Sequence, residues 1–270
     1  MKRKASKLGR FLVLASVLGL VSSARLLLDQ PLKASTTGSQ PASVSDLSTT
    51  EITGDAIFTK LVEFNRLRES RLQQYSVQST YRVQNHKGEM RAETQALLRY
   101  RAPDTKEFKI ISEKGSGLIR SRVFKPLMDV EVETAAERNR LDSSITPNNY
   151  TLALLGEEEV AGSHCFVVQA TPKRADKYLF KGKIWIHSVE FAIVQIEGQP
   201  AKSPSAWITR VDFVRHYQKI GEFWLPLKNK SITRVRFFGK NTLTTDYDNY
   251  EINQVGIARM TESSLNRRAH

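Results

Sequence analysis

The strongest constraint on the fold of this chain is a change of hydrophobic period at Tyr75. From there to about residue 252, apolar and polar side chains alternate in short segments, and Gly, Pro, Asn or Asp separate these segments. About ten strand-like segments follow one another in this way. So many antiparallel strands in chain order do not suit a flat sheet, so we predict one sheet that curls into a barrel or half-barrel.

Helical periodicity occurs in two segments. Residues 53–74 place apolar side chains at helical spacing behind Asp55, which is a candidate N-cap. Residues 117–140 have the second helical pattern, and we expect Pro126 to divide it into two short helices. These helices are the elements available to cover the concave side of the sheet.

The segment 178–198, YLFKGKIWIHSVEFAIVQIEG, reads as two antiparallel strands joined by a tight turn. Its bulky apolar residues are consecutive at 184–186 and 192–194, so both faces of these strands need a cover. We expect one face to line a cavity that the helices close in part and a ligand closes in part.

The N-terminal residues 1–24 have the three regions of a signal peptide. Five basic residues and no acidic one precede a 14-residue apolar run, and Ser22 and Ala24 fit a cleavage site. The alternative is an uncleaved anchor, in which the apolar run continues past Arg25 for about 18 residues in all. Both readings predict export of the rest of the chain.

The remaining chain divides by composition. Residues 25–50 are rich in Ser, Thr, Pro and Gln, so we predict a disordered linker. The folded domain is expected at 51–258 and a flexible tail at 259–270. The single cysteine, Cys165, excludes an internal disulfide bond, so the exported domain must be stabilised by packing.

The charge balance favours anionic partners. The formal net charge of +13 falls to +8 when the signal peptide removes its five positive charges. For an exported protein this favours lipid headgroups, and no nucleic-acid-binding motif occurs, so we expect no nucleic-acid partner. Two groups of basic residues are candidates for contact with a membrane surface: Arg99, Arg101, Lys106, Lys109, Arg120, Arg122 and Lys125, and Lys173, Arg174, Lys177, Lys181 and Lys183.

Three phrases of the sequence resemble the LolA-like family of outer-membrane lipoprotein-sorting proteins. They are GSHCFVVQATPK, the WIHSVEFAIV hairpin and the strand start FWLP, and the resemblance extends over about residues 51–255. It implies a mainly β fold, an unclosed and strongly curved antiparallel β-barrel of about ten strands with two short helical lid segments over a hydrophobic cavity. It also implies non-catalytic binding of lipoprotein acyl chains or other lipids in the periplasm.

An acyl chain needs only an apolar lining, because each CH₂ group contributes about 0.8 kcal/mol on leaving water. The candidate lining residues share one strand face: Tyr81, Val83, Leu98, Tyr100, Phe108, Ile110, Trp207, Val211, Phe213, Val235 and Phe237. The alternative for each of them is an ordinary core position under the helices.

Catalytic and metal-binding patterns do not occur in the sequence. His164, His187 and His216 do not have metal-ligand spacing, and no nucleophile elbow, phosphate loop or dinucleotide motif is found, so we expect no enzyme activity, metal or cofactor. Two functional classes stay open for a monomer. One is a carrier that transports lipoproteins or lipids across the envelope, and the other is a sensor or scaffold that contacts a membrane-bound regulator. An N-terminal anchor favours the sensor, because a fixed sensor need not diffuse.

Overall fold

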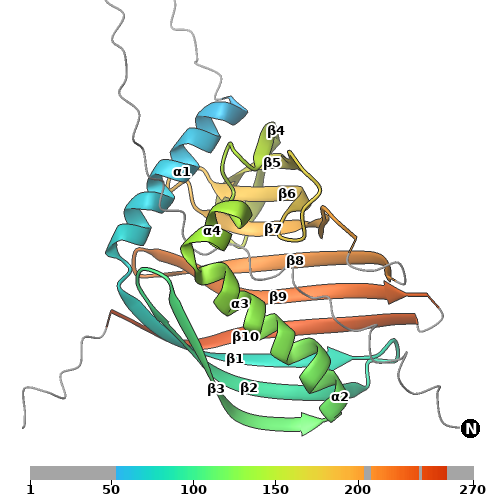
Figure 1. Cartoon of the computed structure of the whole chain (residues 1–270). Helices are drawn as coiled ribbons and strands as arrows, with labels where there is room; N and C mark the ends of the chain where they lie inside the picture. Colours follow the sequence, from blue (N-terminus) through green and yellow to red (C-terminus); the bar gives the residue numbers. More distant parts are fainter. Residues whose placement is uncertain (1–52, 204–207, 237–238, 254–270) are drawn as a thin grey trace, which may run out of the picture.

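The computed structural model describes residues 53–203, 208–236 and 239–253 (Figure 1). The predicted signal peptide, linker and tail therefore lie outside the described residues, as do the side chains of Trp207, Val235 and Phe237. Within the described ranges, no helix has the length and apolar character needed to cross a membrane.

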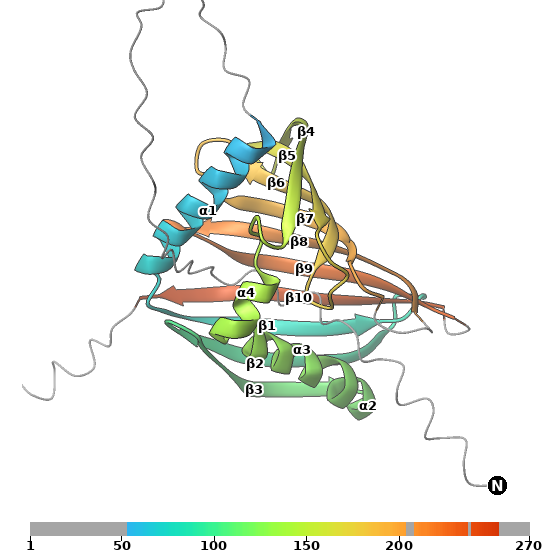
Figure 2. The same ribbon diagram turned by 45° about the horizontal axis from the view of Figure 1, so that its top comes forward.

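One antiparallel sheet contains all ten strands of the described residues, in the order β3-β2-β1-β10-β9-β8-β7-β6-β5-β4. The strands are β1 (Gln74–Gln84), β2 (Met90–Arg101), β3 (Thr105–Gly115), β4 (Tyr150–Val160), β5 (Ser163–Pro172), β6 (Phe180–His187), β7 (Ile193–Pro200), β8 (Ile208–Ile220), β9 (Phe223–Val235) and β10 (Gly239–Ile252). The edges β3 and β4 stand at opposite ends of this order, and the sheet curves around the helices without closing (Figure 2). The predicted mainly β fold, a curved and unclosed antiparallel sheet with ten strands among the described residues, is confirmed.

The helices lie on the concave side of the sheet (Figures 1 and 2). They are α1 (Gly54–Arg71), α2 (Gly117–Ile119), the π-helical segment η2 (Arg120–Phe124), α3 (Lys125–Ala135) and α4 (Glu137–Ser143). The N-cap of α1 is Thr53, whose side chain accepts a hydrogen bond from the backbone N–H of Ala56, and not Asp55 as predicted. Asp55 lies in the first turn, where its charge is favourable for the helix dipole.

Pro126 does not divide the second helix, contrary to the prediction. It lies in the first turn of α3, directly after the wider π-helical turn of η2. Proline has no backbone N–H to donate, and in the first turn of an α-helix this costs no α-helical hydrogen bond. The division comes at Ala136, whose extended backbone separates α3 from α4. The physical consequence is one long lid segment that runs from α2 to the end of α3.

The interior consists of two regions with different covers. In the region called here the filled half, β4 to β7 pack under α1, and Ile57, Phe58 and Leu61 of that helix join the core. In the lid half, β1, β2 and β10 pack against η2 and α3. The residues of these helices in the contact are Val123, Phe124, Leu127 and Met128. Strands β8 and β9 lie between these halves.

The 178–198 hairpin belongs to the filled half, and its Ile193 lines a cavity next to α1. One face, which includes Ile184, Ile186 and Ile193, packs in the core under α1. The other face places Trp185 and Val194 in a small buried cluster on the convex side with Cys165 and Val167. Protein side chains pack against both faces of the hairpin, and a ligand contact at Ile193 stays a prediction.

Candidate functional site: a polar cavity and an apolar groove

The predicted lining residues fall into three groups. Tyr81, Val83, Leu98, Val211 and Phe213 are buried, and all of them except Val211 belong to core clusters. Tyr100 lines a cavity under the helices, and Phe108 and Ile110 line a groove beside α3. Trp207, Val235 and Phe237 lie outside the described side chains.

The concave face of the sheet changes from apolar to polar along one row of paired residues. The row crosses eight strands, from β5 to β2, and consists of Val168, Ile184, Ile196, Arg215, Asn229, Thr245, Tyr81 and Thr94. Its first three members belong to the core of the filled half. From Arg215 onward each member has a polar group, so this row is polar from β8 to β2.

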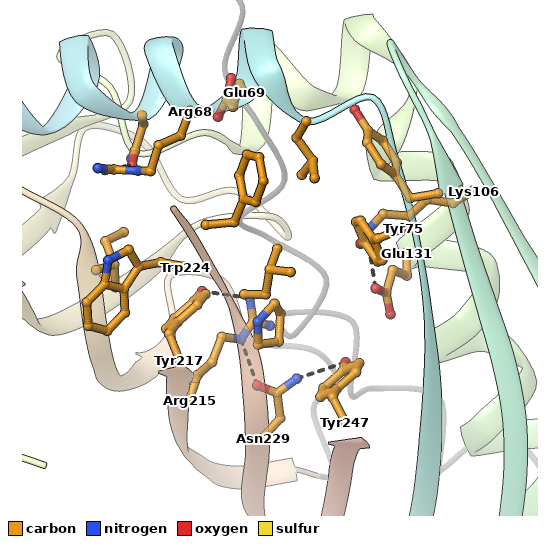
Figure 3. A pocket seen from close by; sticks show the side chains of 17 residues that line it. Arg68, Glu69, Tyr75, Lys106, Glu131, Arg215, Tyr217, Trp224, Asn229 and Tyr247 are labelled. Carbon is orange, nitrogen blue, oxygen red and sulfur yellow. Dashed lines mark hydrogen bonds and ion pairs between the residues drawn. The ribbon is translucent and has the colours of Figure 1, made fainter. Parts of the chain in front are cut away.

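The polar cavity lies where this change occurs, between the C-terminal half of α1, strands β8 to β10 and Glu131 of α3 (Figure 3). Its volume is about 90 Å³, enough for several water molecules or one small ligand group. Leu72, Phe223 and Leu225 contribute an apolar wall, and tyrosines and charged groups contribute the rest.

Arg215 is the centre of a hydrogen-bonded network in this cavity. Its side chain is on the inward face of β8, and the residue is only 4% exposed. Arg215 Nε donates to Asn229 Oδ1 at 2.9 Å, and Nη1 donates to the Tyr217 hydroxyl at 3.4 Å. Asn229 Nδ2 in turn donates to the Tyr247 hydroxyl at 3.1 Å. Figure 3 shows these side chains facing the same space.

The tyrosines of the network are neutral. Burial raises the pKa of Tyr217 and raises that of Tyr247 well above its ordinary value, because the charged form loses its hydration. Both phenols therefore keep their protons at physiological pH.

A buried ion pair forms the opposite wall of the cavity. Lys106 Nζ of β3 lies 3.1 Å from Glu131 Oε1 of α3. Burial opposes the charge on Lys106, but Tyr75 and Glu131 more than offset this effect and hold the pKa of the amine above its ordinary value. Lys106 was predicted as part of a basic surface, and this was wrong, because the residue is buried.

The apolar groove lies beside this ion pair, between β3 and α3. It has a volume of about 570 Å³, and its lining combines the apolar Phe108, Ile110, Met128 and Val132 with Gly117, Ser121 and the charged Glu113, Arg120, Lys125 and Asp129. Phe108 and Ile110 follow Lys106 at alternate positions of β3, and Val132 follows Glu131 in α3. The lining of the groove therefore includes the residue two positions after Lys106 on β3 and the residue directly after Glu131 on α3.

Several basic side chains of the predicted membrane-contacting groups are paired with acids. Arg120 lies 3.5 Å from Glu113, and Lys125 lies 2.7 Å from Asp129. Such exposed pairs reduce the local positive charge around the groove, although they contribute little to stability.

Metal ligation finds no support among the described residues, in which no group of three His, Cys, Asp or Glu side chains converges. The Nε2 atom of His164 lies 3.0 Å from Glu157, and the Nδ1 atom of His187 accepts from the backbone N–H groups of Val189 and Glu190. The histidines noted in the sequence are thus held separately.

Comparison with known proteins identifies the family. The chain matches the family described as "Family of unknown function (DUF5686)" over residues 59–251. The chain belongs to the DUF5686 family. The matched range begins in α1 and ends in β10, so it includes the elements that form the polar cavity and the groove.

Solved structures similar to this DUF5686 protein are distant in sequence. A DUF1329 family protein from Desulfovibrio piger is 15% identical, with a TM-score of 0.42 over 76% of this chain and 94% of that one. A putative outer membrane lipoprotein-sorting protein domain from Vibrio parahaemolyticus is 11% identical, with a TM-score of 0.37 over 75% and 96%. A LolA superfamily protein from Nitrosomonas europaea is 11% identical, with a TM-score of 0.35 over 76% and 96%. No curated protein matches the chain.

Proposed function

We propose that this DUF5686 protein binds the acyl chain of a lipid or lipoprotein without chemical conversion, as a step in lipid or lipoprotein transport in the cell envelope. The observation that carries the proposal is the apolar groove between β3 and α3. The basic start and apolar run of the sequence support export to the periplasm, where such a ligand is available.

The groove has the size and lining that an acyl chain requires. Its volume of about 570 Å³ falls within the range of small-molecule sites, which is roughly 300–1,000 Å³. Ile110 is 43% exposed and Val132 is 39% exposed, so apolar surface faces the groove from both walls. An acyl chain that covers this surface removes CH₂ groups and side chains from water together, and each CH₂ contributes about 0.8 kcal/mol.

The lid provides a route for entry. α3 packs on the sheet through one stripe, which includes Leu127 and Met128. Met128 also lines the groove, together with Asp129 and Val132 of the same helix. A small outward movement of α3 therefore widens the groove and leaves the sheet intact.

The test is saturable binding of a fluorescent fatty acid to the purified protein. Ile110→Asp and Val132→Asp place a carboxylate in the groove at partly exposed positions, so they are expected to weaken binding at least tenfold with little loss of stability. Val189→Asp is the matched control, because Val189 is 73% exposed in a turn of the filled half and should leave binding unchanged. Absence of saturable binding by the wild type, or full binding by both folded groove variants, contradicts the proposal.

A further inference from the structure

We infer that the ligand has a singly charged oxyanion, of the carboxylate class, at one end, and that Arg215 and its two tyrosine neighbours bind this group in the polar cavity. The inference rests on the proposed function, because the groove next to the cavity holds the apolar part of the same ligand.

The hydrogen bonds of Arg215 leave one end of its guanidinium group unused. Nε and Nη1 have the acceptors Asn229 and Tyr217, but Nη2 is buried and has no acceptor among the described residues. A guanidinium group has five N–H donors and no acceptor, so an unused buried nitrogen is unfavourable unless a ligand or water accepts from it. Arg215 lines the cavity, so such an acceptor has space to bind.

The directions of these hydrogen bonds leave Tyr217 and Tyr247 able to donate as well. Tyr217 accepts from Arg215, and Tyr247 accepts from Asn229, so each phenol uses its oxygen within the network and keeps its own O–H proton to donate. Among the described residues, no acceptor is recorded for these two protons. Arg215 Nη2 and two neutral phenols therefore surround one small space with donors, and this arrangement suits an oxyanion.

The charges around the cavity favour a single negative charge on the ligand. Its lining contains three cations and two carboxylates: Arg68, Lys106, Arg215, Glu69 and Glu131. Lys106 is paired with Glu131, and the charge of Arg68 interacts with that of Glu69. Arg68 makes hydrogen bonds to the backbone oxygens of Glu190 and Phe191, at 2.9 Å and 3.0 Å. Arg215 is therefore the lining cation that a ligand anion would balance.

The dimensions of the two spaces determine the shape of the ligand. A cavity of about 90 Å³ accepts a carboxylate and a few carbon atoms, whereas the neighbouring groove of about 570 Å³ accepts a chain. Lys106 and Glu131 line the cavity, and Phe108 and Val132 beside them line the groove. A single-chain fatty acid, with its head at Arg215 and its chain toward the groove, occupies both.

The experiment compares two probes with the same chain, palmitate and hexadecanol, by competition against a neutral fluorescent lipid. In the wild type, palmitate is expected to bind roughly tenfold to a hundredfold more tightly than hexadecanol, because a charge-assisted bond forms away from water. Arg215→Met should reduce this ratio to about one, and Arg215→Lys should retain part of it. Arg210→Met is the control, because Arg210 lies on the same strand but is exposed, and it should leave the ratio unchanged.

Hexadecyl phosphate and free acetate complete the experiment. Hexadecyl phosphate that binds much more tightly than palmitate overturns the assignment to a carboxylate, and acetate that competes as well as palmitate overturns the link to the groove. Equal binding of palmitate and hexadecanol by the wild type overturns this inference alone. No binding of any chain-bearing probe overturns the proposed function together with the inference. If Arg215→Met does not fold, the wild-type ratio and Arg215→Lys still decide the outcome.

Discussion

The filled half and the lid half belong to the same sheet, but their inner faces are packed in different ways. In the filled half, α1 inserts Ile57, Phe58 and Leu61 against the apolar inner faces of β4 to β7, and protein side chains occupy the interior. In the lid half and on the neighbouring strands β8 and β9, polar atoms without hydrogen-bond partners among the described residues are buried: Tyr81 Oη, Thr94 Oγ1, Arg215 Nη2 and Ser231 Oγ.

This difference is what the proposed function requires, with one half that supplies stability and one that binds the ligand. Buried polar groups without partners lower the stability of a fold, so a domain that needed only stability would have apolar side chains at these positions. The filled half holds the curved sheet in shape. Under the proposed function, the polar row and the open groove stay available for a ligand.

The largest expected effect is the loss of a core contact in the filled half. Leu61 of α1 is fully buried, so Leu61→Ala should lower the free energy of unfolding by about 2–5 kcal/mol through lost transfer energy and a cavity. Urea denaturation measures this change. Leu67→Ala is the matched control on the same helix, because Leu67 is 49% exposed, and a loss of similar size there would contradict the assignment of the core.

The thiol of Cys165 gives a second test of the filled half. Burial raises its pKa from 9.0 to about 11, with Glu159 as a smaller cause. Since the reactive species is the thiolate, modification by a thiol reagent at pH 8 should be about a hundredfold slower in the folded protein than in urea. Between pH 9 and 11 the unfolded thiol loses its proton first, so stability should fall as pH rises, and Cys165→Ala should remove this contribution.

The sequence predicts the strands of both halves, but it does not predict how the interior of each half is filled. Alternation of apolar residues predicted the strands well, because a buried face needs an apolar side chain at every second position. It also placed Phe108 and Ile110 on the lining of a groove. Alternation did not show which inner faces the protein itself fills, because that depends on where α1 and α3 lie.

The polar cavity was not predicted, because the predicted lining consisted of apolar and aromatic positions of the strands. A signal existed in VDFVRHYQ, where Arg215 occupies an inward position between Phe213 and Tyr217. A charged residue at an inward strand position indicates a site. Its partner Asn229 is identified only by the register of β8 and β9, which a single sequence does not provide.

The smallest predicted effect has the opposite sign and belongs to the lid half. Thr94 is fully buried, and its hydroxyl has no partner among the described residues, so Thr94→Val should raise the free energy of unfolding by about 1 kcal/mol. Thr134→Val is the control, because the Thr134 hydroxyl donates to the backbone oxygen of Val130 at 2.8 Å, and its removal should lower stability. Thermal denaturation of both variants measures the two signs, and a destabilised Thr94→Val would mean that the Thr94 hydroxyl has a hydrogen-bond partner in the folded protein.

The most direct test of the difference between the halves is hydrogen–deuterium exchange of the protein with and without palmitate. Ligand binding slows exchange everywhere to the extent that it stabilises the native state, so the informative quantity is protection beyond this uniform effect. We predict additional protection in β3, η2 and α3, and none in β5 and β6. Additional protection confined to β5 and β6, or the absence of any protection at saturating palmitate, would contradict the account.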